Sequence, residues 1–108
     1  MNNRPFLHQQ AIPRKVKEAV LAIDPEAEVI LFGSQARGST HEESDWDFLV
    51  LSKKISTSAE QRAFYDKMLD IELVTGEVFS FLINEPSAWK NKQGWPIYDE
   101  ITQDGILL

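Results

Sequence analysis

Two short apolar runs joined through a glycine turn constrain the fold of this 108-residue chain more than any other feature. The first run, Glu28–Phe32, is nearly continuous and too short for an ordinary helix, so it predicts a buried β-strand. It ends at Gly33, which suits a sharp strand-to-helix turn. The second run starts near Asp45 and continues to about Leu51, and it predicts another strand. A strand, a turn, a polar loop and a second strand therefore form the expected centre of the fold.

Helical periodicity flanks these strands. Apolar residues at three- and four-residue steps predict a helix from Ile12-Pro13, with the proline in its first turn, to Ile23. The stretch Ser56–Glu60 has the composition of a helix N-terminus, and an apolar face after it predicts a helix that ends before Thr75-Gly76. Residues Glu77–Ile83 are rich in aromatic and β-branched types and predict a third strand. Short helices and an apolar tail are expected after it.

Length, charge and composition restrict the classes of protein to consider. We expect one domain over residues 1–108, with its motif-bearing core in residues 28–83, because the length suits one modest core. Seventeen acidic and eleven basic residues give a net charge of −6, which disfavours long DNA or RNA as a ligand. Cysteine is absent, and the sequence has neither a signal-peptide pattern nor a long apolar span. We therefore expect a cytoplasmic protein that does not bind a membrane.

The turn after the first strand is a candidate phosphate site. Gly33 lets a ligand approach the backbone, and Ser34 is a suitable N-cap for a short helix through Arg37. The N–H groups at that helix start, the serine hydroxyl and the Arg37 guanidinium together suit an anion. These residues also occur in an ordinary strand-to-helix turn, so the turn alone leaves both interpretations open.

Two aspartates in the second strand add a candidate metal site. Residues two apart in a strand project from the same face, roughly 7 Å apart, so Asp45 and Asp47 can serve one cation. The residues Trp46, Phe48 and Val50 then point to the opposite face. Neighbouring carboxylates repel each other unless a cation neutralises them, and hard oxygen ligands suit Mg²⁺ or Mn²⁺. Taken singly, each aspartate is also compatible with a capping or exposed position.

Together, the segment Gly33–Gly38 and the Asp45-Trp46-Asp47 triplet, with ten residues between Ser34 and Asp45, resemble the DNA polymerase β-like nucleotidyltransferase superfamily. The similarity is greatest to its small single-domain members, the minimal nucleotidyltransferases. The resemblance implies an α/β (α+β) fold with a small mixed β-sheet flanked by helices. It also implies that Gly33 and Ser34 hold nucleotide phosphates, while Asp45 and Asp47 bind Mg²⁺ or Mn²⁺ and are catalytic.

The third carboxylate that active members usually carry on a later strand is ambiguous in this chain. The expected position aligns near Ser80, whose hydroxyl cannot replace a carboxylate as a base at neutral pH. The only acid in the predicted third strand is Glu77. Glu77 is therefore the candidate third catalytic acid, and the alternative is that this acid is absent.

The resemblance implies metal-dependent transfer of a nucleoside monophosphate, AMP from ATP, to a hydroxyl acceptor. It further suggests the antitoxin role of minimal nucleotidyltransferases, with an all-helical HEPN-type protein as partner. One alternative is a catalytically impaired module of the same fold that binds a partner protein or a nucleotide. Another is an ordinary α/β domain with a chance motif, which predicts no metal-dependent nucleotide binding.

Overall fold

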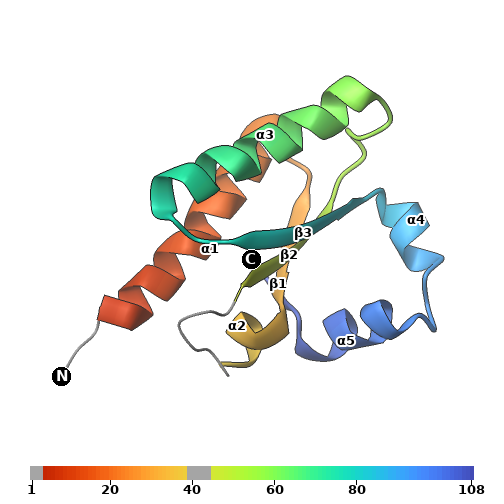
Figure 1. The fold of residues 1–108 in the computed structure, drawn as a ribbon. Helices are drawn as coiled ribbons and strands as arrows, with labels where there is room; N and C mark the ends of the chain where they lie inside the picture. The colour runs from red at the N-terminus through yellow and green to blue at the C-terminus, as the bar shows by residue number, and fades with distance from the viewer. Residues whose placement is uncertain (1–3, 39–44) are drawn as a thin grey trace.

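The computed structural model describes residues 4–38 and 45–108, with side chains described for 11–38 and 45–108. Its centre is a four-stranded mixed sheet with the strand order β3-β2-β1-β4 (Figure 1). The strands are β1 (Glu28–Phe32), β2 (Trp46–Leu51), β3 (Phe79–Asn84) and β4 (Ile106–Leu107). β1 is antiparallel to both β2 and β4, whereas β2 and β3 run parallel. The predicted small mixed sheet is confirmed.

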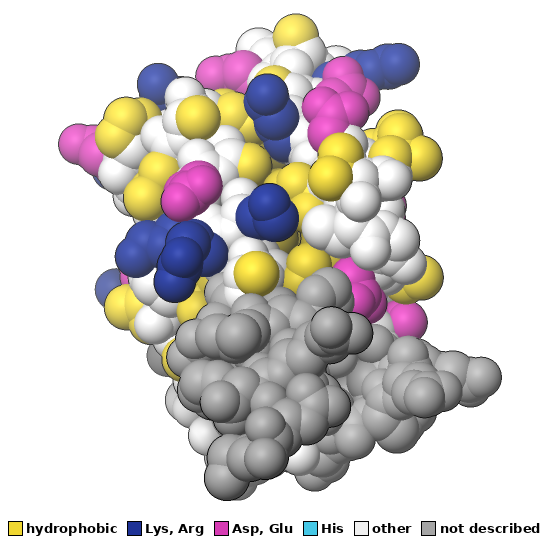
Figure 2. All heavy atoms as spheres, turned by 90° about the vertical axis from the view of Figure 1, so that its left-hand side faces the viewer, with side chains coloured by type: hydrophobic (Ala, Val, Ile, Leu, Met, Phe, Trp, Pro, Cys, Tyr) yellow, Lys and Arg dark blue, Asp and Glu magenta, His cyan; other side chains and the backbone are white. Residues whose placement is uncertain are grey.

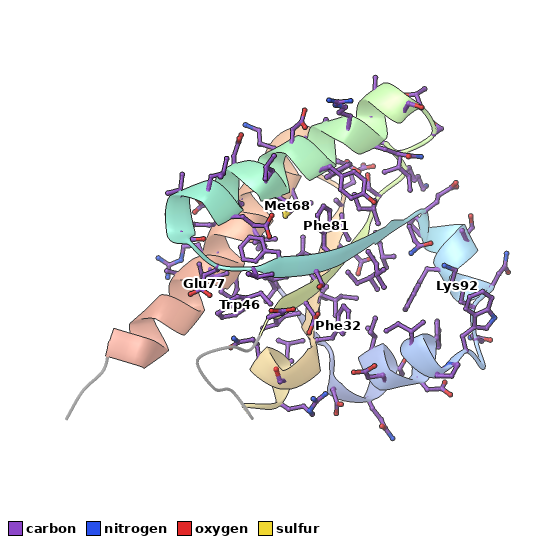
Figure 3. The ribbon with its side chains drawn as sticks, viewed as in Figure 1. Phe32, Trp46, Met68, Glu77, Phe81 and Lys92 are labelled. Atoms are coloured by element: carbon purple, nitrogen blue, oxygen red, sulfur yellow. The ribbon has the colours of Figure 1, made fainter. Side chains whose placement is uncertain are left out.

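The helices α1 (Arg4–Ile23) and α3 (Ser58–Thr75) cover one face of the sheet (Figure 1). Apolar side chains from both helices and from the three long strands fill the space between them and form the larger core. Within it, Trp46 and Phe48 stack at a centroid separation of 6.3 Å, and Phe79 packs edge-on against Phe48. Figure 3 shows Met68 of α3 and Phe81 of β3 on this side of the sheet.

Three short helices lie toward the opposite face: α2 (Gly33–Arg37), α4 (Pro86–Lys90) and α5 (Pro96–Asp104). A second core forms here from Phe32, Leu49, Leu51, Trp89 and Ile101. The strand alternation explains the two cores, because odd-numbered residues of β2 face α5 and even-numbered ones face α1 and α3. The face that carries Asp47 is therefore buried over β1 and β2, as the sequence predicts.

Two helix starts differ from the sequence-based predictions. α1 begins at Arg4, so Pro13 lies inside the helix rather than in its first turn; the ring removes only one N–H from an otherwise long amphipathic helix. α2 begins at Gly33, and its N-cap is Phe32, with no side-chain cap hydrogen bond. Ser34 is thus a residue of the helix and not its N-cap. By contrast, Thr57 caps α3 in a full capping box with Glu60.

The ends of the sheet also differ slightly from the predictions. β3 spans Phe79–Asn84, so Glu77 lies before the strand. The apolar tail is confirmed in part, because Ile106 and Leu107 extend the sheet as a short strand beside β1. No helix in the described ranges is long and apolar enough to cross a membrane.

Figure 2 shows the side of the molecule at the left of Figure 1, toward α1 and α3. On the described part of this surface, basic, acidic and apolar side chains are interspersed, and no continuous basic area is visible. A shallow pocket between the two helices is lined by both signs of charge, including Lys15, Glu18, Lys67 and Asp70. The described part of this face does not have the uniform positive charge of a phosphate-backbone binding surface.

Candidate nucleotide site at the β1–α2 turn

The turn between β1 and α2 holds its backbone directly against a carboxylate. Gly33 has φ 76°, a left-handed conformation that favours glycine. A Cβ atom built on Gly33 would overlap the Asp47 carboxylate and would lie 3.0 Å from its Cγ. The register explains the contact, because Asp47 is the Cα partner of Phe32, the last residue of β1. Glycine is thus required at this position for both its conformation and its lack of a side chain.

The two predicted metal ligands are close to each other at the start of β2. Asp45 is exposed and immediately precedes the strand, and Asp47 is half-buried in it. Burial raises the pKa of the Asp47 carboxyl above its ordinary value; the charges of Asp45 and Glu100 raise it further, and Arg37 opposes them. The structure therefore places a partly desolvated carboxylate against the candidate phosphate turn, with a second acid near it. A cation would relieve their repulsion.

Arg37, the third predicted phosphate-binding residue, lies at the end of α2 facing α5. Its Nη1 atom is 3.7 Å from Glu100 Oε1 and 3.5 Å from Asp104 Oδ2. The sequence-based reading missed both acids. Their i, i+4 spacing places them on one face of α5, but nothing in the sequence indicates that this face meets α2. The candidate site therefore also contains the Arg37 guanidinium, which is paired with two acids of α5.

The structure shows how Ser80, the position expected for a third acid, lies relative to Asp47. Ser80 is the Cα partner of Asp47 in the parallel β2–β3 pair, so the two residues share one face of the sheet. β3 itself contains no acidic residue. Glu77 lies in the connection from α3 to β3, as Figure 3 shows, three residues before Ser80. Phe79 and Phe81, which like Glu77 are odd-numbered, pack on the side of the sheet that faces α1 and α3, opposite to the side of Asp47.

The acids on α3 differ in their exposure. Asp66 and Asp70 are exposed, as is typical of a solvated helix face. Glu72 is half-buried instead, and its Oε2 atom accepts a hydrogen bond of 2.9 Å from the Phe79 N–H. This contact joins the end of α3 to the start of β3.

The donor set at the turn fits a hard divalent cation that is shared with a substrate. In the described part of the chain, no three His, Asp or Glu side chains are grouped closely enough to hold a metal alone. Two carboxylates with open positions are the arrangement by which Mg²⁺ is bound together with substrate phosphates and water. The two histidines of the sequence, His8 and His41, lie outside the described side chains.

The two tryptophans after β3 differ in how deeply they are buried. Trp89 is buried, with its ring 5.2 Å from that of Tyr98. Trp95 is half-exposed, and the Lys92 ammonium lies 5.3 Å from its ring centroid. Trp89 therefore belongs to the second core.

Comparison with known proteins agrees with this geometry. A family model of nucleotidyltransferase domains matches residues 13–105. A Methanocaldococcus jannaschii protein with the provisional name of protein adenylyltransferase is 36% identical over 78 residues, which cover 72% of this chain and 74% of that protein.

Solved structures share the fold. A toxin–antitoxin solved with AMP-PNP is 16% identical, with a TM-score of 0.62 over 87% of this chain and 69% of that one. A poly(U) polymerase with MgGTP bound is 24% identical, with a TM-score of 0.52 over 65% of this chain. A cytoplasmic RNA terminal U-transferase is 26% identical, with a TM-score of 0.51 over the same share. This chain spans only 22% and 21% of the latter two chains.

Proposed function

Since this chain belongs to the nucleotidyltransferase domain family, we propose that it transfers AMP from ATP to a hydroxyl group of a protein acceptor. The observation that carries the proposal is the contact between the Gly33 backbone and the Asp47 carboxylate. A phosphate turn and a metal-capable acid are adjacent there, as the transfer of a nucleotide requires.

In the proposed reaction, the acceptor hydroxyl oxygen attacks the α-phosphorus of ATP. A new bond forms between that oxygen and the α-phosphorus, the bond from the α-phosphorus to the bridging oxygen breaks, and pyrophosphate leaves. The hydroxyl proton passes to a base or to solvent. The backbone N–H groups of the turn and the Ser34 hydroxyl hold phosphate oxygens, and Arg37 supplies positive charge beside them. These contacts orient the triphosphate for in-line attack.

Asp45 and Asp47 would hold Mg²⁺ or Mn²⁺ together with the phosphates. A bound cation supplies charge neutralisation of the triphosphate and of the leaving pyrophosphate. The raised pKa of Asp47 supports this role, because its cause is partial burial beside like charges that a cation offsets. Glu77 remains the candidate base from the sequence analysis. Because it lies before β3, it would reach the acceptor hydroxyl only if the connection between α3 and β3 moves.

We further infer that the acceptor belongs to a separate protein. The structural similarity to a toxin–antitoxin and the sequence similarity to a provisionally named protein adenylyltransferase support a protein acceptor. An all-helical HEPN-type partner, with this chain as antitoxin, is the arrangement that the resemblance of the motif suggests. The net charge of −6 favours a protein acceptor over a long nucleic acid.

A second candidate function is a catalytically impaired module that binds nucleotide and partner without turnover. The observation that favours it is Ser80, which occupies the position beside Asp47 without a carboxylate.

Incubation with a HEPN-type partner, Mg²⁺ and ATP labelled in the α- or the γ-phosphate separates the two functions. If the protein is a transferase, the partner should become labelled with α-labelled ATP but not with γ-labelled ATP, and Asp47→Asn should abolish this labelling. No labelling of the partner, in a protein that still binds ATP with Mg²⁺, supports the impaired module.

A further inference from the structure

We propose that the free edge of β3 binds an extended, basic segment of the acceptor protein as an added strand, and so brings the acceptor hydroxyl to Asp47. This inference deepens the proposed function and rests on it for the identity of the reaction.

The hydrogen-bonding edge of β3 is the first observation. In the described part of the chain, β2 is the only strand that pairs with β3. The Val78 C=O accepts from the Trp46 N–H, and the Asn84 C=O accepts from the Ser52 N–H, each at 3.0 Å. Even-numbered residues therefore direct their backbone groups toward β2, and Phe81 and Ile83 direct theirs outward. Such an edge is a template for an extended chain.

The side of β3 that carries Ser80 is also uncovered. Helix α5 and Trp89 bury the corresponding face over β1 and β2. Over β3, in contrast, Val78 is 58% exposed, Leu82 is 38% exposed and Ser80 is exposed between them. A strand added at this edge gains two apolar contacts on the catalytic face, separated by the small Ser80 side chain.

The register relates this edge to the site. Ser80 is the partner of Asp47, so the residue of an added strand opposite Ser80 is the second neighbour of Asp47 on the same face. Two strand spacings place its Cα roughly 10 Å from the Asp47 Cα. An acceptor side chain that extends from the added strand and an α-phosphate bound near the Asp47 carboxylate can together span this separation. Ser80 leaves room for both, where a larger side chain would intrude.

The charge near the catalytic end of β3 selects the occupant. Asp47 lies at that end in β2, and the exposed Asp45 immediately precedes the strand. At the opposite end, the exposed Glu85 after β3 is matched by the exposed Lys53 and Lys54 after β2, so the negative charge gathers at the catalytic end. A segment with Lys or Arg around its hydroxyl residue complements these acids, whereas an acidic segment is repelled.

The test appends a probe to the C-terminus through a Gly/Ser linker. The probe is a short segment in which Lys or Arg alternates with Val around one Tyr, and a twin with Pro at alternate positions is the control. The linker gives an effective concentration in the millimolar range, so weak pairing is populated. Hydrogen–deuterium exchange reads the Phe81 and Ile83 amides without any need for turnover. We expect slower exchange at both amides with the probe and not with its proline twin.

Unchanged exchange at Phe81 and Ile83, or protection only at β4, overturns the proposal. Protection that rises with protein concentration in the absence of the probe assigns the edge to a second copy and also overturns it. The pair Val78→Lys and Val78→Glu tests the charge argument. We expect labelling of the probe tyrosine from α-labelled ATP to fall about tenfold in Val78→Lys relative to Val78→Glu; equal labelling counts against a basic segment.

Binding of AMP-PNP with Mg²⁺ to the same fusion proteins separates this inference from the proposed function. Intact nucleotide binding without edge protection rejects only the docking mode. Edge protection without any nucleotide binding rejects the transferase.

Discussion

Replacement of Gly33 by alanine tests the close contact on which the site depends. The change adds a Cβ atom that overlaps the Asp47 carboxylate, in a backbone conformation with φ 76°. The left-handed conformation alone costs an alanine about 1–2 kcal/mol. Displacement of the half-buried Asp47 side chain adds about 1–3 kcal/mol, the usual range for overpacking. Gly33→Ala should therefore lose roughly 2–5 kcal/mol of the free energy of unfolding.

Gly76→Ala is the matched control. Gly76 has φ 74° and caps α3, and an added Cβ would meet no atom within 4 Å. It should lose only the conformational part, about 1–2 kcal/mol. Each kcal/mol corresponds to roughly 4–8 °C in Tm for a chain of this size. Chemical denaturation gives both free energies, and calorimetric titration gives the affinity for AMP-PNP with Mg²⁺.

We expect Gly33→Ala to be less stable than Gly76→Ala and to bind the metal–nucleotide complex at least tenfold more weakly, while Gly76→Ala keeps the wild-type affinity. Equal stabilities together with equal affinities in the two variants would refute the contact between the turn and Asp47.

Three further predictions concern other parts of the chain. The Ser52 hydroxyl donates to the buried Asp24 carboxylate at 2.7 Å, and this bond is the main reason that the Asp24 pKa is lowered despite its burial. A lowered pKa stabilises the fold above the ordinary range of aspartate, so Ser52→Ala should cost about 1–3 kcal/mol at pH 7, and urea titrations at decreasing pH should show that the loss shrinks as Asp24 becomes protonated. Arg37→Ala should change stability by less than about 1 kcal/mol, because its ion pairs are exposed, yet weaken AMP-PNP binding about tenfold in calorimetry. Thr57→Ala removes the cap that accepts from the Glu60 N–H and should lower the free energy of unfolding by about 1 kcal/mol, as thermal denaturation would show.

Local sequence patterns were sufficient for the strands that build the site. The apolar run Glu28–Phe32 forms β1 at its predicted bounds, and β2 starts one residue after the predicted Asp45. The alternation of side chains along β2 also correctly predicts that Trp46, Phe48 and Val50 face away from the side that carries Asp47. Short buried strands bounded by turn residues carry this information in few positions.

Tertiary contacts determine what the sequence leaves open. The length of α1 depends on packing against α3 and the sheet, which allows Pro13 inside the helix. The pairing of Arg37 with α5 joins residues 63 and 67 positions apart, and no local pattern predicts it. The parallel register sets Ser80 beside Asp47, and the expectation that a third acid belongs at this position stays a prediction. The catalytic roles of the site residues stay predictions.

The most direct test of the metal–nucleotide site is calorimetric titration with AMP-PNP, with Mg²⁺ and with a chelator, in wild type, Asp47→Asn and the control Asp70→Asn. Asp70 is exposed on α3. Because the Asp47 pKa is raised, its ionisation disfavours the free fold as the pH rises through that pKa, so Asp47→Asn should be more stable than wild type at neutral pH. Loss of AMP-PNP binding in Asp47→Asn then reflects the missing metal-binding carboxylate and not unfolding. We predict Mg²⁺-dependent binding of AMP-PNP in wild type and Asp70→Asn and none in Asp47→Asn. Equal binding in all three proteins, or binding that does not depend on the metal, would contradict a metal–nucleotide site at Asp47.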